Sequence, residues 1–295
     1  MFRGAITALV TPLRHDRVDE DALVRLVEQQ IAAGIDGLVP CGTTGEASTL
    51  STAEHLRVVE LTLQAARGRV PVLAGAASND TREAIELARA CKQLGAAGTL
   101  QVTPYYTRPT QAGLVAHFTA IADQSDLPVV VYNVPGRTGV DLLPDTVAEL
   151  ARHPKIVGIK EATGDLNRAA RLRELLRDRP HFALLSGDDF TVFPFLALGG
   201  HGVISVTSNV APAWVAGLVD AAFGGRWDEA RALHDRHYPL ARALFTQPNP
   251  IPVKAAMALL GRMSGEMRLP LVAIDPNSRE GLNLADTLQT LGLLQ

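Results

Sequence analysis

The chain is poor in the residues that mark several classes of protein. It has two cysteines, Cys41 and Cys91, whose separation fits no zinc motif and suits a reducing cytoplasm. The net charge of −3 and the absence of a basic stretch argue against a nucleic-acid partner. No run approaches the ~20 apolar residues of a membrane helix, and the start Met1-Phe2-Arg3-Gly4 shows no signal-peptide pattern. We expect a soluble cytoplasmic protein with no nucleic-acid or membrane partner.

Lysine is also scarce, and its scarcity makes one position informative. Arginine carries most of the positive charge, and the only lysines are Lys92, Lys155, Lys160 and Lys254. Lys160 closes the apolar run 156–159, where burial would disfavour the ammonium form. A neutral amine in such a place can attack a ketone and form a Schiff base. Taken alone, Lys160 is better explained as a surface lysine whose stem lies along a strand end, and it is the rest of the chain that favours the reactive amine.

Short apolar runs recur along the chain and alternate with amphipathic stretches. Most of the runs are continuous, as expected of strands that are covered on both faces. They predict strands over residues 5–10, 37–40, 70–74, 99–102, 128–132, 156–160, 182–185 and 203–206. The first amphipathic stretch predicts a helix that begins after Asp19 and Asp21 and ends at Gly34. Its apolar face consists of Leu23, Leu26, Val27 and Ile31. The second predicts a helix that ends at Gly95, and its apolar face consists of Ala84, Leu87, Ala88, Cys91 and Leu94.

This alternation predicts an α/β fold, specifically a (β/α)8 TIM barrel with a C-terminal helical extension. We place the strands and loops of the barrel in residues 1–209. The final barrel helix and the helical region then occupy residues 210–295. A doubly wound sheet is the alternative, but no Gly-x-Gly-x-x-Gly turn follows the first strand. The pattern therefore favours the barrel.

Polar residues gather where the predicted strands end, which is the active-site face of such barrels. These ends carry Thr11, 42–46, Tyr105, Tyr106, 132–138, Lys160, 186–189 and 205–209. Strand alternation places Ile156, Gly158 and Lys160 on one face, so that Gly158 leaves room for the lysine stem. Glu161 then faces the helical layer, where we expect a structural role. The result is a pocket with an amine, phenols, hydroxyls and a guanidinium.

That set of groups suits carbon–carbon chemistry through a Schiff base. The imine nitrogen acts as an electron sink, and proton carriers must serve the neighbouring carbon; Tyr132, Thr43 and Tyr106 are the right types. The planar fork of Arg137 suits a substrate carboxylate, and its charge could help to lower the pKa of Lys160. Each has an ordinary alternative. The tyrosines can be packing residues, Thr43 and its neighbour Thr44 helix caps, and Arg137 a surface ion pair.

Metal-dependent aldol chemistry is the rival mechanism, and the histidines argue against it. None closes a predicted strand, and only His234 and His237 lie close in the sequence, where we expect a solvated helix face. Asp188 and Asp189 could ligate a cation or accept a proton, but a turn and a polar network are the better interpretation. Cys41 has no histidine partner in the sequence pattern and is expected to pack in the interior. We predict no metal site.

Several motifs together resemble the dihydrodipicolinate synthase (4-hydroxy-tetrahydrodipicolinate synthase) family of class I pyruvate aldolases. They are GTTGE at 42–46, YNVPGRTG at 132–139 and GIKEATGD at 158–165. Further matches lie at 102–106, 185–189, 199–207 and 248–254. The resemblance runs in register from Gly4 almost to the end of the chain and is specific in combination.

The resemblance implies condensation of pyruvate with L-aspartate-4-semialdehyde, on the route to diaminopimelate and lysine. It implies no separate cofactor, because pyruvate is held as an imine on Lys160. The proton donor and acceptor falls on Tyr132, and the relay on Thr43 and on Tyr106, the latter supplied by a neighbouring subunit of a homotetramer. The substrate-binding positions fall on Thr44, Arg137, the backbone of Ile204, and Gly187.

Many bacterial members of this family are inhibited by lysine at a dimer interface. The matching effector positions here keep the polar residues His55, Asn79, Glu83 and Tyr105. Ala47 and Thr52, however, stand where lysine-sensitive members often carry serine and histidine. Loss of two polar groups from a small-ligand site costs ~1 kcal/mol or more each. We therefore expect weak or absent inhibition by lysine.

Two other functions remain open. Related class I pyruvate aldolases of the hydroxy-oxoglutarate, keto-deoxy-sugar or N-acetylneuraminate type share the fold and the lysine. The synthase is favoured by Arg137 and by the full set of Thr43, Tyr106 and Tyr132, because a short aldehyde that bears a carboxylate needs such a clamp. A non-catalytic pyruvate-binding protein on the same barrel would be expected to lose Lys160 or its tyrosines, and this chain keeps them.

Overall fold

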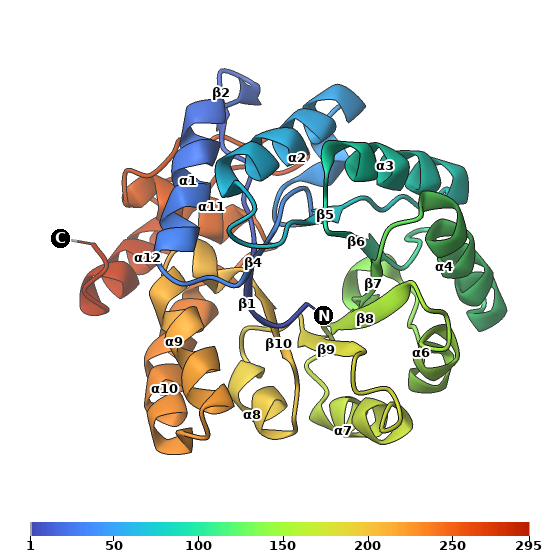
Figure 1. Ribbon diagram of the computed structural model, residues 1–295. Coiled ribbons are helices and arrows are strands. Elements are labelled where there is room, and N and C mark those ends of the chain that lie inside the picture. Colours follow the sequence, from blue (N-terminus) through green and yellow to red (C-terminus); the bar gives the residue numbers. More distant parts are fainter. Residues whose placement is uncertain (1, 295) are drawn as a thin grey trace.

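Eight apolar runs of the sequence form one parallel sheet that curls into a barrel (Figure 1). The computed structural model describes residues 2–294, so Met1 and Gln295, the outer ends of the two expected regions, lie outside the described residues. The strands are β1 (Gly4–Ala8), β4 (Gly37–Val39), β5 (Leu73–Gly75), β6 (Gly98–Val102), β7 (Val129–Asn133), β8 (Ile156–Glu161), β9 (Ala183–Ser186) and β10 (Gly202–Ser205). All eight predicted strands are confirmed, with ends that differ by up to three residues.

The sheet order is β4-β1-β10-β9-β8-β7-β6-β5, in which neighbouring strands run parallel. A single bridge between Leu38 and Val72 joins its two edges and closes the barrel. The predicted (β/α)8 barrel is therefore confirmed, and the doubly wound alternative is excluded by this closure. A short antiparallel pair, β2 (Leu13–Arg14) and β3 (Arg17–Val18), lies outside the barrel sheet.

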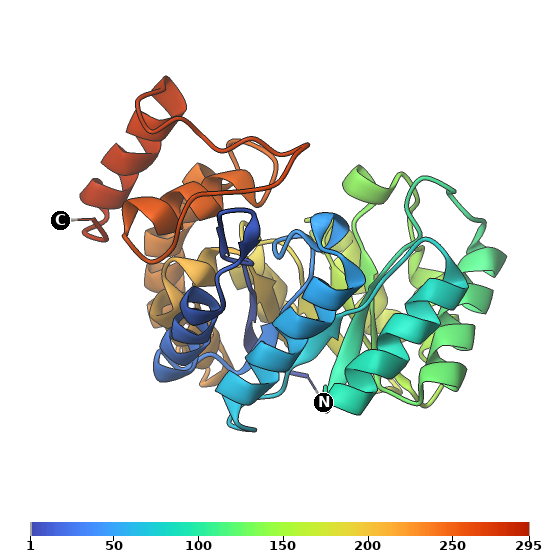
Figure 2. The ribbon, with the colours of Figure 1, turned by 90° about the horizontal axis from the view of Figure 1, so that it is seen from above.

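Helices surround the sheet and continue into the C-terminal extension (Figure 2). Those of the barrel are α1 (Glu20–Ala32), α2 (Thr52–Ala66), α3 (Thr81–Leu94), α4 (Gln111–Ser125), α5 (Pro135–Thr138), α6 (Pro144–Leu150), α7 (Leu166–Leu175), α8 (Val192–Ala197) and α9 (Pro212–Phe223). The extension contains α10 (Trp227–Leu244), α11 (Ile251–Leu259) and α12 (Arg279–Thr290), and short 3-10 turns occur at η1 (Ala47–Thr49) and η2 (Thr207–Asn209). Because β10 and η2 end by residue 209, we propose to keep the division at 209/210.

The helix ends follow from local chemistry. The side chain of Asp19 accepts a hydrogen bond from the backbone of Ala22 (3.0 Å) and so caps the start of α1. Gly34 and Gly95 follow α1 and α3 in the left-handed conformation that favours glycine. Both predicted helices are confirmed. Within residues 2–294, no helix is at once long enough and apolar enough to cross a bilayer.

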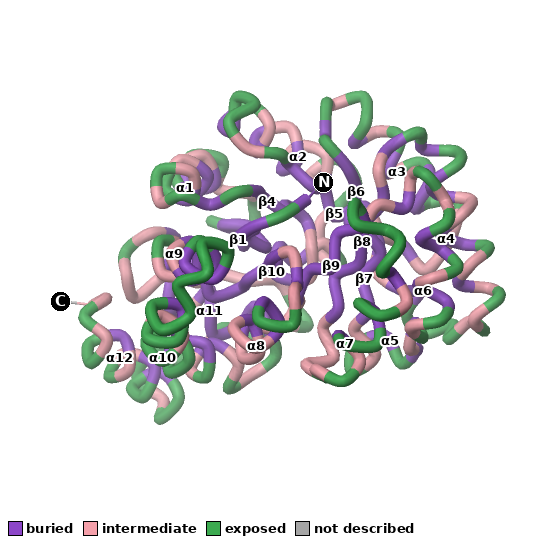
Figure 3. Tube along the Cα trace, turned by 60° about the horizontal axis from the view of Figure 1, so that its bottom comes forward, coloured by how far each residue is buried: buried purple, intermediate pink, exposed green. Residues whose placement is uncertain are grey.

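The core has two apolar layers, one inside the barrel and one between sheet and helices. Figure 3 shows the barrel strands largely buried, with exposed segments on the helices and loops around them. Strand β8 departs from strict alternation between them, because Val129 pairs with Ile156 but Val130 with Gly158. The skipped residue between them rotates the start of the strand. Ile156 therefore lies in the outer layer, and the prediction that it shares a face with Lys160 is wrong.

Candidate active site

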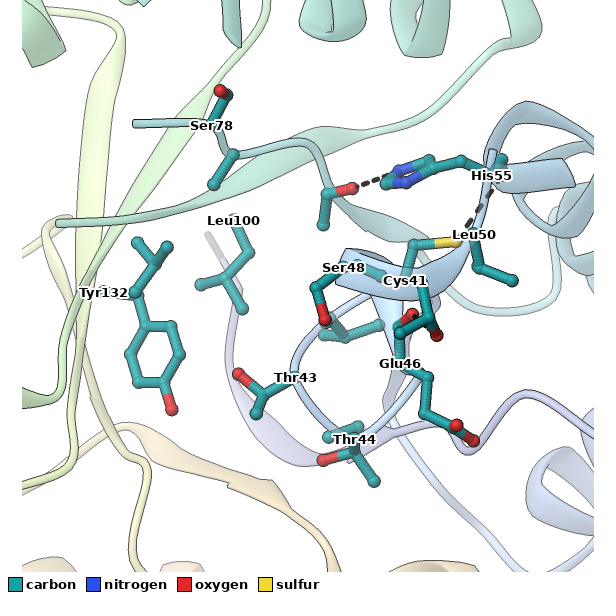
Figure 4. Close-up of a pocket in the computed structure, with 18 of the residues that line it drawn as sticks. Cys41, Thr43, Thr44, Glu46, Ser48, Leu50, His55, Ser78, Leu100 and Tyr132 are labelled. Atoms are coloured by element: carbon teal, nitrogen blue, oxygen red, sulfur yellow. Dashed lines mark hydrogen bonds between the residues drawn. The ribbon is translucent and has the colours of Figure 1, made fainter. Parts of the chain in front are cut away.

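A cavity of about 820 Å³ opens at the carboxyl ends of the strands, as the barrel predicts. Its lining includes Thr43 and Thr44 after β4, Tyr132 on β7, Arg137 on α5, and Lys160 on β8. These are five of the residues that the sequence singled out. Figure 4 shows Thr43 between Thr44 and Tyr132, with its hydroxyl directed toward the phenol ring.

Lys160 is buried at the mouth of the barrel, where only 6% of it is exposed. Burial lowers the pKa of its amine to about 8; the charge of Asp189 opposes this shift and that of Arg137 adds to it. The amine nitrogen lies 4.2 Å from the centroid of the Tyr132 ring. At pH 7 roughly one amine in ten is then neutral, against roughly one in 2,500 for an ordinary lysine. Lys160 is therefore suited to nucleophilic attack.

Gly187 makes the space that the stem of Lys160 occupies. A Cβ atom at this position would lie 2.9 Å from Cε of Lys160 and 2.7 Å from Cβ of Ala162. At Gly158 a Cβ atom would instead meet Ala183, at 2.8 Å. The prediction that Gly158 leaves room for the lysine stem is therefore wrong. Gly158 allows close packing of β8 on β9, and Gly187 is the residue that clears the amine.

Tyr132 is buried beside the lysine and is in its protonated form at neutral pH. Burial raises the pKa of its phenol, while the charge of Arg137 and a hydrogen bond with Thr43 act in the opposite direction. A phenol and a neighbouring hydroxyl can each donate and accept a hydrogen bond. The structure therefore brings Tyr132 and Thr43, two of the three residues of the expected relay, close together within one chain.

Tyr106, the other expected member of the relay, is not brought to the cavity by its own chain. It is 89% exposed, has a positive φ of 69°, and does not belong to the lining of the cavity. Its neighbour Tyr105 does line the cavity. A role for Tyr106 near Lys160 therefore depends on a second copy of the chain.

A loop of the C-terminal extension completes the cavity through Asn249. Its side-chain amide donates a 2.9 Å hydrogen bond to the hydroxyl of Thr44, and its backbone carbonyl accepts one from Arg137 at 3.3 Å. Thr44 is thus held by the extension and caps no helix. The role of Asn249 was missed, although the resemblance covers 248–254, because no local pattern marks a contact between residues 205 positions apart.

Asp189 and Asp188 shape the polar network that the sequence suggested. Asp189 accepts hydrogen bonds from Ser205 Oγ (2.5 Å) and from the backbone N–H groups of Val206 (2.8 Å) and Thr207 (3.2 Å). Asp188 accepts one from Thr191, and burial raises the pKa of its carboxyl. Residues 2–294 contain no group of three His, Cys, Asp or Glu residues placed to hold a metal ion.

The structure also tests the predictions for Glu161, for Cys41 and for the two histidines of α10. Glu161 is buried and accepts hydrogen bonds from Asn133 and from the backbone of Thr163, which confirms a structural role. Cys41 is buried, and burial raises the pKa of its thiol, which confirms that it packs in the interior. His237 is fully buried, so the solvated helix face predicted for His234 and His237 is wrong at His237. Helix α10 carries its imidazole inward, toward the barrel.

The remaining expected positions are also placed. Ile204 lies inside the barrel, paired with Ile6 of β1. The effector positions gather on another part of the same cavity, whose lining includes His55, Glu83, Tyr105, Ala47 and Thr52. Asn79 is outside the lining and donates a hydrogen bond to the carbonyl of Tyr105 (3.4 Å). The structure thus joins the two expected sites in one continuous space.

Comparison with known proteins gives a single family. The model of the dihydrodipicolinate synthetase family matches residues 1–290. The 4-hydroxy-tetrahydrodipicolinate synthases of Pelobacter propionicus and Syntrophus aciditrophicus are each 53% identical over 294 residues, with 100% of both chains covered. Two solved dihydrodipicolinate synthases superpose with TM-scores of 0.97 over 100% of both chains: that of Thermotoga maritima, 43% identical, and that of Acinetobacter baumannii, complexed with pyruvate, 44% identical. The chain belongs to the dihydrodipicolinate synthetase family.

Proposed function

We propose that the chain condenses pyruvate with L-aspartate-4-semialdehyde to 4-hydroxy-tetrahydrodipicolinate, in the biosynthesis of diaminopimelate and lysine. Its relatives at 53% identity carry the name of this activity. The observation that carries the proposal is the amine of Lys160, which is buried at the barrel mouth with a pKa lowered to about 8. Family membership and the free, buried cysteines Cys41 and Cys91 support action in the cytoplasm.

The neutral amine of Lys160 attacks C2 of pyruvate, and loss of water from the adduct leaves an iminium ion. Loss of a C3 proton, with the electron pair moving toward nitrogen, gives an enamine. The enamine carbon forms the new bond to the aldehyde carbon of the second substrate, and the resulting alkoxide takes up a proton. The amino group of that substrate then attacks C2, closes the ring and releases Lys160. One water is lost overall, and no oxidant or reductant is required.

The other site residues receive their roles from this sequence of steps. Tyr132 and Thr43 exchange the protons at C3 and at the adduct oxygen, and Tyr106 of a neighbouring copy connects them to solvent. Thr44 and the backbone of Ile204 hold pyruvate, with Gly187 beside it. Arg137 binds the carboxylate of the aldehyde substrate through its planar fork.

Assembly as a homotetramer, a dimer of dimers, belongs to the same proposal. The 89% exposure of Tyr106 supports it, because that side chain is free to enter the cavity of a second copy. A solved relative with a TM-score of 0.97 is described as a monomeric variant, so assembly needs its own measurement. Analytical ultracentrifugation measures the assembly state, and the activity at a series of protein concentrations shows whether turnover depends on it.

The decisive experiment is the rate of condensation, coupled to a downstream reductase, with aspartate semialdehyde and with a sugar-derived aldehyde in parallel. Efficient turnover of the former supports the synthase. Turnover of the latter alone, with pyruvate still trapped by borohydride, would make the chain a related pyruvate aldolase. Absence of both turnover and trapping would leave a binding protein. In the variant Lys160→Ala both turnover and trapping should be lost. Lys155→Ala is the matched control for that variant, because Lys155 is a half-exposed lysine paired with Asp126 at 2.7 Å.

We also propose that inhibition by lysine is weak or absent. Ala47 and Thr52 line the effector part of the cavity and offer fewer polar groups than serine and histidine would. The double variant Ala47→Ser/Thr52→His should gain sensitivity to lysine. Half-inhibition of the unmodified chain below a millimolar concentration of lysine would contradict this proposal.

A further inference from the structure

Beyond Lys160, toward helix α10, a buried imidazole faces a buried carboxylate. Nε2 of His237 lies 3.7 Å from Oδ1 of Asp189, and their side chains are 0% and 2% exposed. The gap exceeds a hydrogen bond, and a movement of under about 1 Å would close it. The proposed mechanism assigns no role to His237.

Asp189 has one place left for a donor. Its Oδ2 accepts the backbone N–H groups of Val206 and Thr207, and its Oδ1 accepts the hydroxyl of Ser205. A carboxylate oxygen can accept two hydrogen bonds, so Oδ1 keeps a free lone pair. His237 is the side chain that faces this oxygen.

His237 in turn has no other partner. Neither of its ring nitrogens makes a hydrogen bond within residues 2–294. Burial lowers the pKa of the imidazole; Asp189 opposes this and His234 adds to it. No charged group of the described residues of α8, α9, α11 or α12 contributes to this balance. The neutral ring therefore carries one N–H group, and the free lone pair of Asp189 is the acceptor that it faces.

Asp189 also acts on the reacting amine. Its negative charge favours the protonated form of Lys160 and so works against burial. During the reaction the lysine nitrogen alternates between neutral and positive forms, while the carboxylate stays where the backbone N–H groups of Val206 and Thr207 hold it. The strength of this fixed counter-charge depends on how many donors share it.

We propose that His237 is a positioning residue that acts on Lys160 through Asp189. By donating to Oδ1 it holds the carboxylate and spreads its negative charge, so that the lysine releases its proton more readily. The inference rests on the proposed function only in taking Lys160 as the reacting amine.

The test is the pH midpoint at which Lys160 becomes reactive. Labelling of the full chain with trinitrobenzenesulfonate across pH, read at the Lys160 peptide, measures that midpoint without substrate. His237→Leu should raise it by about half a pH unit, which is roughly threefold less neutral amine at pH 7. His237→Gln keeps an N–H group and should restore the midpoint. His234→Gln, which changes a half-buried histidine stacked on Phe193, should leave it unchanged.

An unchanged midpoint in His237→Leu, or an equal rise in all three variants, overturns the inference. Should His237→Leu fail to fold by circular dichroism, the ¹⁵N resonances of the unmodified protein decide instead. Nε2 must be the protonated nitrogen, and protonation at Nδ1 overturns the inference. Pyruvate trapping is run on the same samples. A shifted midpoint without a pyruvate adduct would reject the proposed function and retain this role for His237.

Discussion

Two lysines are buried in this molecule, and their surroundings give them opposite roles. Lys254 on α11 is fully buried in an ion pair with Glu46, which follows the Thr43–Thr44 loop. Lys160 forms no ion pair within residues 2–294, and its amine lies over the ring of Tyr132. Burial lowers the pKa of both, but only Lys254 has a carboxylate in contact to oppose it. A paired buried lysine joins the extension to the barrel, whereas the unpaired one is left with a reactive amine.

The strongest test of this contrast is Lys160→Ala. Loss of the nucleophile should lower condensation by at least about 10⁴-fold and abolish borohydride trapping of pyruvate. The variant should fold as well as the original, because an unpaired buried amine costs stability. Intact-mass analysis after borohydride, with thermal unfolding on the same sample, checks both points. Continued trapping would place the imine on another lysine.

Lys254→Ala should have the opposite profile. It leaves Glu46 buried and unpaired, which should cost about 3–5 kcal/mol of unfolding free energy. Denaturant unfolding measures this loss, and pyruvate trapping should persist in the folded fraction. The double variant Lys254→Met/Glu46→Leu is the control, because replacing both partners by apolar groups should recover most of the loss. A single variant as stable as the original would contradict a structural role for the pair.

The free energy of unfolding should rise with pH because of Lys160. Its pKa is about 8 in the folded chain and near its ordinary value of 10.5 in the unfolded chain. Between these values the unfolded chain binds more protons, so stability increases with pH, by about 3 kcal/mol across the window. Denaturant unfolding from pH 7.5 to 10.5 measures the slope. The same series on Lys160→Ala should lack this component, and equal slopes would refute the lowered pKa.

Gly187→Ala should disturb the reactive lysine without touching the paired one. The new Cβ would lie 2.9 Å from Cε of Lys160, so the amine must shift. A displacement of this kind should slow imine formation by on the order of 10-fold. Gly158→Ala is the matched control, because its Cβ meets Ala183 and should cost stability alone. Rapid-quench trapping compares the two, and equal rates would remove the space-making role of Gly187.

The smallest effect is expected at the contact between Thr44, at the barrel mouth, and Asn249 of the C-terminal extension. Thr44→Val removes the hydroxyl that accepts from Asn249, at a cost of about 1 kcal/mol. The expected result is a rise in KM for pyruvate of about fivefold, with a smaller change in kcat. Steady-state kinetics of the condensation checks this. Thr49→Val, which loses only a local hydrogen bond to Glu46, is the control.

The sequence predicted the parts of this molecule that depend on local pattern. The eight strands, the helix ends at Gly34 and Gly95, and the buried amine of Lys160 all follow from short runs of residue type. The bulge that turns Ile156 outward could not be predicted, because strand pairing with β7 creates it. The resemblance named Tyr106, and its role stays a prediction.

What was missed lies in contacts between distant segments. Asn249 reaches Thr44 across 205 positions, and Lys254 reaches Glu46 across 208. The burial of His237 depends on how α10 packs against the barrel, which the residue types along the helix alone do not reveal. The space for the stem of Lys160 was assigned to Gly158 instead of Gly187 for the same reason, since only the side chain opposite each glycine distinguishes them.

The ion pair between Glu46 and Lys254 can form only after most of the barrel has been synthesised. A nascent chain leaves the ribosome with its amino end first, so all eight strands and Lys160 are made before Lys254 appears. Until then Glu46 has no lysine to neutralise it, and Thr44 lacks Asn249. The mouth of the barrel is therefore completed only after residue 254 has been made, well after Lys160 itself.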